Sequence, residues 1–188
     1  YKFSGCEGGT RIPFIIKWPE HVEPGSTCRR LIGLNDLMAT LAEIAGVTLT
    51  SEQATDSISY LPLLTDPLAK ATRHNIQIQG THGWAYRMGN WKLCLCPGSG
   101  ALGVHGNVPK PADAWVAAVK EFGGKPTREQ LLAAPFVQLY NLANDLAEQN
   151  DVSKQHPKVV EEMFALMQQQ FNNGRSTPGP RLQNDRAT

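Results

Sequence analysis

The stretch that decides the fold reads Ile12-Pro13-Phe14-Ile15-Ile16-Lys17-Trp18. Its hydrophobicity at 12–16 is continuous rather than alternating, which is typical of a strand buried on both faces of a mostly parallel sheet. Turn residues lie on either side of this stretch, at 7–9 and at 23–26. The stretch therefore predicts a strand that belongs to an α/β layer.

A helix is predicted after this strand. Asn35 is a suitable N-cap, and the carboxylate of Asp36 in the first turn complements the helix dipole. Gly46 lies where a left-handed C-cap is expected. The apolar residues that recur at helical spacing are Leu37, Leu41 and Ile44. Strand, turn and amphipathic helix together indicate the edge of an α/β layer.

The second half of the chain has a different pattern. Residues 74–79 alternate between apolar and polar side chains. Residues 84–87 and 91–95 flank a compact turn at 88–90, which predicts an antiparallel hairpin with one wet face. A further short strand is expected at 136–140.

The last predicted helix begins at Pro157, a residue that suits the first helical position, and ends at Gly174. Its apolar stripe consists of Val160, Met163, Phe164, Met167 and Phe171. The tail that follows is rich in proline and polar residues, so we expect it to be extended and weakly packed.

These patterns divide the chain into four parts. Residues 1–50 are predicted to be the last strand and helix of an N-terminal α/β domain, and residues 51–72 to be a connector. Residues 73–174 are predicted to form a small antiparallel-sheet subdomain with a packed helix. Residues 175–188 form the extended tail.

Composition and charge exclude several classes of protein. The chain of 188 residues carries 18 basic and 17 acidic side chains, for a formal net charge of +1. This balance gives no electrostatic attraction to nucleic acid or to anionic lipid. No apolar stretch approaches the roughly 20 residues that a membrane helix needs. We therefore expect no nucleic-acid partner and no membrane segment. The opening at Tyr1, without Met or a leader, is typical of a fragment.

The residues by themselves name no catalyst. The chain holds no GxSxG, HExxH, Walker or GxGxxG motif, and its five histidines are scattered. A lone histidine such as His82 is more often a structural or surface residue than a catalyst. The Glu-Gly-Gly turn at 7–9 is compatible with an anion-binding nest of backbone amides. A tight turn that leads into a buried strand is the favoured interpretation.

Four cysteines are present, at Cys6, Cys28, Cys94 and Cys96. The last two are two residues apart in a predicted strand, so their side chains point to the same face. No pair with CxxC-type spacing is available for a zinc site, and we expect no metal ligands. Mostly buried thiols are favoured over a redox or metal role, and the disulfide status stays open.

Four segments follow one another in a characteristic order. The first joins Lys2 to a Glu-Gly-Gly-x-Arg segment at 7–11, an apolar run and a closing Trp-Pro. The second is an Asp-Leu-x-x-Thr-Leu helix at 36–41, and the third a Gly-x-Trp-Lys-Leu hairpin at 89–93. The fourth, at 139–148, combines Leu-Tyr-Asn-Leu with an Asp-x-x-Glu motif. Together they resemble type I sulfatases, the formylglycine-dependent sulfatase and arylsulfatase family.

The chain departs from the family pattern at a few positions. The family commonly has Tyr, Gly, Asp, Pro and Asn where this chain has Cys6, Phe3, Asn141, Leu146 and Asp151. These differences loosen local turns and do not touch the chemistry of the family.

The resemblance implies an α/β fold of the alkaline-phosphatase-like superfamily. The chain would hold a remnant strand and helix of the large catalytic α/β domain, followed by the small C-terminal antiparallel sheet with its packed helix. The parent protein would hydrolyse sulfate esters of a carbohydrate or an aryl group with a formylglycine and a calcium ion, and family habit suggests a periplasmic or secreted protein. No Cys or Ser lies here in the Cys/Ser-x-Pro/Ala-x-Arg motif that gives formylglycine. We therefore expect no cofactor in this chain, and no activity from it alone.

The resemblance also implies two site residues. Lys2 aligns with the lysine that contacts the sulfate group, where a cation would stabilise charge on the transferring sulfuryl oxygens. Because the C-terminal sheet of sulfatases helps to shape the substrate cleft, His82 and the segment 97–126 are candidates for contacts with the leaving group. Glu7 and Arg11 are expected to be architectural, as a buried turn with a paired charge.

Two alternatives remain open. The first is a fragment of a phosphodiesterase or phosphonate hydrolase of the same superfamily, which an upstream nucleophile would distinguish. The second is a non-catalytic interaction module, against which the buried-type strand at 12–16 argues because it needs neighbouring strands. If the chain folds alone, we expect residues 1–47 to be disordered, repacked, or paired with another copy through the orphaned strand.

Overall fold

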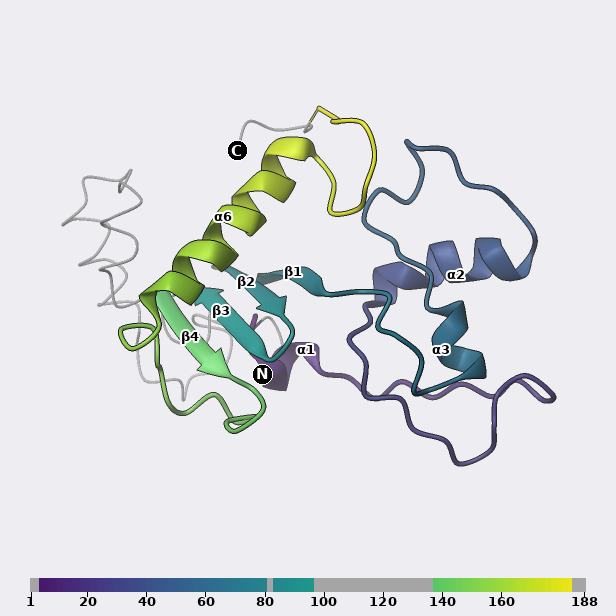
Figure 1. The fold of residues 1–188 in the computed structure, drawn as a ribbon, viewed down its shortest axis with the longest axis horizontal. Helices are drawn as coiled ribbons and strands as arrows, with labels where there is room; N and C mark the ends of the chain where they lie inside the picture. The colour runs from purple at the N-terminus through teal and green to yellow at the C-terminus, as the bar shows by residue number, and fades with distance from the viewer. Residues whose placement is uncertain (1–3, 81–82, 97–136, 184–188) are drawn as a thin grey trace. The chain divides into compact units, whose positions relative to one another are not determined.

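The computed structural model describes residues 4–80, 83–96 and 137–183 (Figure 1). The chain divides into two compact units. One consists of Tyr1–Ile12 and Gln77–Ala165, here called the sheet unit, and the other of Pro13–Ile76 and Leu166–Thr188, here called the helical unit. The domain boundaries drawn from the sequence stay predictions.

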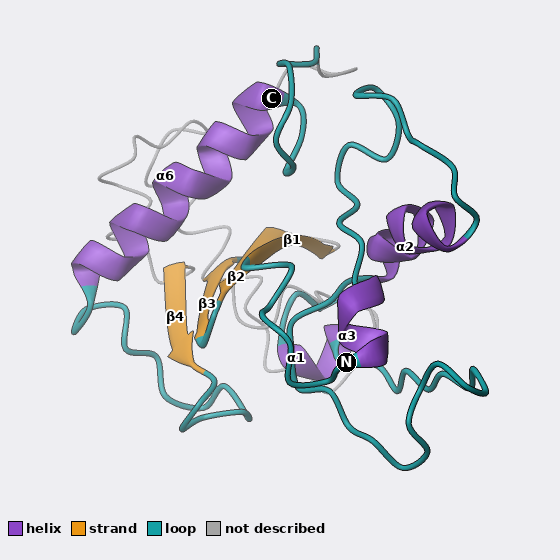
Figure 2. Cartoon of the chain, turned by 45° about the vertical axis from the view of Figure 1, so that its right-hand side comes forward, coloured by secondary structure: helices purple, strands orange, loops and turns teal. Residues whose placement is uncertain are grey.

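The sheet unit is built on a four-stranded sheet in the order β1-β2-β3-β4 (Figure 2). The strands are β1 Asn75–Gly80, β2 Gly83–Met88, β3 Trp91–Leu95 and β4 Val137–Asn141. Both β2 and β4 pair with β3 in antiparallel orientation. The turn between β2 and β3 contains Gly89 at a φ of 56°, a conformation that glycine adopts without steric cost. The predicted hairpin and the predicted fourth strand are confirmed.

The register of the sheet separates two buried faces. On one face Tyr86 lies opposite Leu93, which lies opposite Leu139. The first half of helix α6, Pro157–Asn173, covers this face with the buried side chains of Val160 and Met163 (Figure 1). Val160 and Met163 are three residues apart, so they lie on one side of the helix and belong to the apolar stripe predicted from the sequence.

The second face carries Ala85, Lys92, Cys94 and Tyr140, and it is buried too. The expectation of one wet face is therefore wrong. The segment at 4–12 covers this face, and a Cβ added at Gly5 would lie 3.0 Å from the Cβ of Ala85. A lysine in the strand pattern indicated solvent, but Lys92 is buried because it has an ionic partner.

Helix α6 ends as predicted. Its last residue is Asn173, and Gly174 follows at a φ of 64°, in the left-handed conformation of a C-cap. None of the helices in the described residues is long and apolar enough to cross a membrane.

The helical unit contains a 3-10 turn, η1 Leu34–Asp36, and two helices, α2 Leu37–Ile44 and α3 Leu61–Thr65. Helix α2 is the predicted helix, and Gly46 follows it at a φ of 68°. The apolar residues of α2 lie at the surface, however, and Leu41 is 58% exposed. The stripe exists as predicted, but no described part of the chain covers it.

The strand expected at 12–16 is not formed. The segment has no regular secondary structure, and Ile15 is 91% exposed. A strand exists only when its backbone N–H and C=O groups pair with a neighbour, and no described strand pairs with this segment. The apolar sequence is therefore present without the partners that would make it a strand.

The tail after α6 is more firmly held than the sequence suggests. Arg175 is buried and donates hydrogen bonds to the carbonyl oxygens of Ser51 at 2.9 Å and Thr177 at 3.0 Å. Thr177 in turn donates from Oγ1 to the carbonyl oxygen of Thr55 at 2.6 Å. The expectation of weak packing is wrong at this point, because one arginine satisfies several carbonyl groups of the tail and of the loop before α3.

Candidate functional site

The two predicted site residues, Lys2 and His82, lie outside the described residues, as does the segment 97–126. The described chain begins at Ser4, two residues after Lys2 in the sequence. Ser4 is buried, and its side chain accepts a hydrogen bond from the backbone N–H of Cys6 at 3.0 Å. Ser4, Gly5 and Glu7 are buried, so the described chain begins with a packed segment.

The Glu-Gly-Gly turn forms a single helical turn, α1 Glu7–Thr10. The Arg11 backbone N–H donates to the carbonyl oxygen of Glu7 at 2.8 Å. The side chain of Glu7 is buried, whereas Arg11 is exposed. The architectural role predicted for Glu7 fits this burial, but the partner expected in Arg11 is wrong.

The partners of Glu7 come from the sheet. Lys92 in β3 is fully buried, and its Nζ donates to Oε1 of Glu7 at 2.9 Å. Arg87 in β2, which is 26% exposed, donates from Nη1 to Oε2 at 3.3 Å. Because Lys92 and Arg87 lie on the same face of the sheet, one carboxylate pairs with both cations and fixes the turn on that face.

A second carboxylate lies beside this ion pair. Glu148 accepts a hydrogen bond at Oε2 from the backbone N–H of Glu7 at 2.7 Å, and its side chain is only 5% exposed. Its Oε1 lies 4.0 Å from the Nζ of Lys92, too far for a hydrogen bond, and has no hydrogen-bond partner in the described part of the chain. Burial raises the pKa of Glu148, and the charge of Lys92 lowers it in part.

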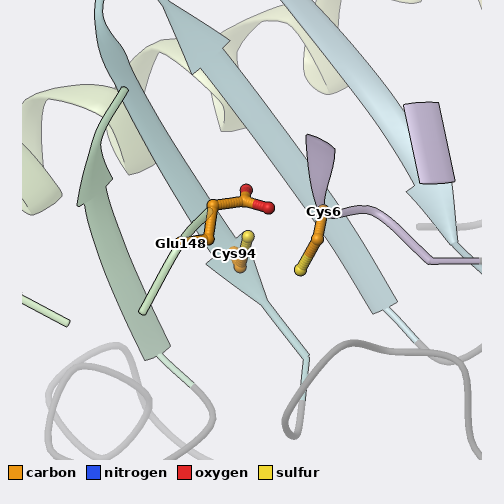
Figure 3. Close-up of side chains that lie close together, drawn as sticks. All are labelled: Cys6, Cys94 and Glu148. Atoms are coloured by element: carbon orange, nitrogen blue, oxygen red, sulfur yellow. The ribbon is translucent and has the colours of Figure 1, made fainter. Parts of the chain in front are cut away.

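Two thiols complete this group. The ligand atoms of Cys6, Cys94 and Glu148 all lie within 4.8 Å of one another (Figure 3). Its hydrogen bond with Cys94 and its burial raise the pKa of the Cys6 thiol. The hydrogen bond with Cys6 lowers the pKa of Cys94, but the hydrogen bond with Cys96 and burial outweigh it, and the pKa is raised. Thiols that stay neutral in this way are poor nucleophiles.

The four cysteines are free thiols. Cys94 and Cys96 are buried as expected, whereas Cys28 is exposed. No local pattern predicts the grouping of Cys6, Cys94 and Glu148, because these residues come from three separate segments. Cys6 is among the positions at which the chain departs from the family pattern given in the sequence analysis.

Comparisons with known proteins agree on one family. No protein-family model matches the chain. An N-acetylgalactosamine-6-O-sulfatase from Bacteroides thetaiotaomicron is 31% identical over 89% of this chain. The chain belongs to the sulfatase family. This sulfatase chain is also similar to an ulvan-active sulfatase from Formosa agariphila, which is 28% identical over 90% of the chain described here. The resemblance drawn from the four segments is thus confirmed.

A solved structure supports the same assignment for the fold. This structure comes from work on the metabolism of multiple glycosaminoglycans by Bacteroides thetaiotaomicron. Its sequence is 31% identical to that of the sulfatase chain, and the two structures superimpose with a TM-score of 0.65 over 89% of the sulfatase chain. The predicted α/β fold class is confirmed by this likeness. The chain spans 28% and 35% of the two curated relatives and 30% of the solved chain. It therefore corresponds to about a third of a sulfatase of their length.

Proposed function

We propose that this chain is part of a sulfatase that hydrolyses sulfate esters of a carbohydrate. The observation that carries the proposal is the match over 89% of the chain to an N-acetylgalactosamine-6-O-sulfatase. The ulvan-active relative is also named for a carbohydrate. An aryl sulfate is the second substrate class, supported by an arylsulfatase K from Xenopus laevis that is 29% identical over 87% of the chain.

We further propose that the nucleophile and its metal come from sequence beyond these 188 residues. The chain contains no Cys/Ser-x-Pro/Ala-x-Arg motif that would give formylglycine. Calcium prefers a set of oxygen ligands, and the metal-compatible group in the described residues offers two thiols and one carboxylate. The sequence therefore does not fit a formylglycine, and the metal-compatible group of the described residues does not fit calcium.

The residues of this chain would contribute a sulfate contact. In this proposal Lys2 binds the sulfuryl oxygens. The ion pair between Glu7 of α1 and Lys92 of β3 anchors the segment that follows Lys2. A cation aimed at those oxygens stabilises the charge that develops on them in the transition state. His82 is proposed for the leaving-group side of the substrate, where its loss would raise KM more than it lowers kcat.

The replacement Lys2→Ala tests the assignment in the complete sulfatase. Loss of one preorganised charge contact is expected to lower kcat by about 10²–10³-fold. The measurement is sulfate release from a 6-O-sulfated N-acetylgalactosamine, with an aryl phosphodiester as the comparison substrate. Lys17→Ala, which removes an exposed lysine near Lys2 in the sequence, is the matched control and should leave kcat unchanged.

Either of two results would contradict the proposal. Full sulfate release by the Lys2→Ala enzyme would remove Lys2 from the site. Faster hydrolysis of the phosphodiester than of the sulfate ester would favour the phosphodiesterase alternative instead.

The exposed apolar residues of the helical unit suggest how the isolated chain behaves. The side chains of Ile15, Met38 and Leu41 are all more than half exposed. Large apolar side chains that gather at a surface often mark a contact with another part of a protein. We propose that further sulfatase sequence covers them in the complete protein. The isolated 188-residue chain is therefore expected to be inactive and to self-associate.

Sedimentation velocity over a range of concentrations measures this self-association. The double variant Ile15→Lys/Leu41→Lys should shift the chain toward monomer, because lysine opposes apolar contact between copies. A monomeric wild-type chain at every concentration would contradict the proposal. The substitution Glu52→Lys changes the charge of an exposed polar residue and serves as the control.

A further inference from the structure

A group of metal-compatible side chains lies in the sheet unit and takes no part in the proposed sulfatase reaction. Cys6 comes from the segment before α1, Cys94 from β3, and Glu148 from the loop after β4 (Figure 3). Their ligand atoms lie within 4.8 Å of one another. Three chain segments thus converge on one point with two sulfur atoms and one carboxylate oxygen.

The buried carboxylate points to a ligand. Only 5% of the Glu148 side chain is exposed, yet its Oε1 accepts no close hydrogen bond from the described residues. In the metal-free chain its neighbours are the Cys6 thiol and the Lys92 ammonium, which is 4.0 Å from Oε1, and they offset its desolvation cost less fully than a directly bound cation would.

We propose that Cys6, Cys94 and Glu148 bind one zinc ion. Two thiolates and one carboxylate are a ligand set that suits zinc and is too soft for calcium or magnesium. A water molecule would fill the fourth position, because the metal-compatible group of the described residues consists of these three side chains. The proposal does not depend on sulfatase activity.

The distances are compatible with tetrahedral coordination. Zinc–sulfur bonds of about 2.3 Å place two thiolate sulfurs about 3.8 Å apart. The ligand atoms, within 4.8 Å of one another, therefore need to close by about 1 Å, a movement that side-chain rotation supplies.

The charge of the surroundings also permits zinc. Glu7 and Glu148 are balanced by Lys92 and Arg87, so this group is formally neutral while both thiols are protonated. Zinc binding releases two thiol protons to solvent and adds two positive charges, which leaves the formal charge unchanged. The Lys92 ammonium is held by Glu7 at 2.9 Å and lies farther, at 4.0 Å, from Oε1 of Glu148.

Zinc would act as a clamp in this position. It would join the segment before α1 to β3 and to the loop after β4, in addition to the Glu7–Lys92 ion pair. A metal that binds only the folded chain stabilises it by mass action, so the zinc-loaded protein should unfold at a higher temperature than the metal-free protein.

The experiment uses the full chain that carries this sequence, reduced with a non-chelating reductant and freed of metal. Titration with Co²⁺, a spectroscopic substitute for zinc, is expected to give a thiolate-to-metal charge-transfer band that saturates at one ion per chain. Zn²⁺ should then displace Co²⁺ and abolish the band. The Cys6→Ser and Cys94→Ser variants are expected to lose the band.

The controls separate binding from folding. Cys28→Ser removes an exposed thiol outside the group and should keep the full band. Glu148→Gln keeps both thiols and should weaken Zn²⁺ binding more than about 100-fold, since even the loss of an outer-shell partner costs 10–100-fold. Circular dichroism confirms that each variant is folded before its titration is read.

Three outcomes would overturn the proposal. They are a wild-type chain that gives no charge-transfer band, a band that persists in folded Cys6→Ser and Cys94→Ser variants, and a Cys6–Cys94 disulfide in place of a metal in the protein purified from cells.

Discussion

Replacement of Glu7 by Gln is expected to lower the free energy of unfolding of the sheet unit by about 3–5 kcal/mol. The amide keeps the shape of the side chain but removes the charge that lies 2.9 Å from the Nζ of Lys92. Lys92 is fully buried, and its remaining neighbours are Thr10 Oγ1 at 3.5 Å and Glu148 Oε1 at 4.0 Å. Neither distance allows a strong charge-assisted hydrogen bond, so an ammonium group would be buried without an adequate partner.

A double-mutant cycle tests this interpretation. Lys92→Met removes the buried cation and fills its space with an apolar side chain, but it leaves Glu7 with only Arg87. The double variant Glu7→Gln/Lys92→Met should be less destabilised than the sum of the two single variants, with a coupling energy of about 1–3 kcal/mol. The measurement is denaturant unfolding followed by tryptophan fluorescence.

The control for this cycle is Glu161→Gln, which removes an exposed carboxylate from α6 of the same unit. Its effect on the free energy of unfolding should stay within about 0.5 kcal/mol. Additive single and double variants would mean that the ion pair contributes no specific energy, and the support assigned to α1 would then fail.

Replacement of Asp36 by Asn is expected to destabilise the helical unit by a similar amount, about 3–5 kcal/mol. Asp36 and Arg73 are both buried, and the Nε of Arg73 donates to Oδ2 of Asp36 at 2.8 Å while Nη2 contacts Oδ1. The same carboxylate accepts from the backbone N–H of Gly33 and of Ile58, each at 2.8 Å. The amide of Asn would remove the charge and turn one acceptor into a donor that faces other donors.

Hydrogen exchange read by mass spectrometry measures this effect within the helical unit. Amides of α2 and of residues 58–65 should lose protection, since Asp36 joins the start of α2 to the segment before α3. Glu52→Gln, an exposed change in the same unit, should leave their protection unchanged. Unchanged protection of α2 in the Asp36→Asn variant would show that the buried pair does not hold this unit together.

From the sequence, Asp36 is expected only to place a favourable charge in the first turn of a helix. Its larger role depends on Arg73, which lies 37 residues away. The same holds for Glu7, whose partner Lys92 lies 85 residues away. Such pairs carry no local pattern, because the periodicity of a helix or a strand says which face a residue occupies and not which residue it meets.

Local signals were sufficient where a structure closes on itself. The hairpin of β2 and β3 turns at Gly89, and α6 runs from Pro157 to the residue before Gly174, as predicted. In these elements the backbone hydrogen bonds lie within a helix or between two adjacent strands. The residues that specify them are therefore neighbours in the chain.

Tertiary structure decided the rest. The apolar run at 12–16 has the composition of a buried strand, yet it forms none, because strand formation depends on partners that composition does not supply. Conversely, a lysine in a strand is typical of a solvent-facing position, but Lys92 is buried because Glu7 supplies its counter-charge. The group of Cys6, Cys94 and Glu148 is likewise a product of the fold. The sequence by itself determined the family and the local elements of this protein, and non-local pairing determined which of its polar groups lie inside, since burial of a charge depends on a partner from elsewhere in the chain.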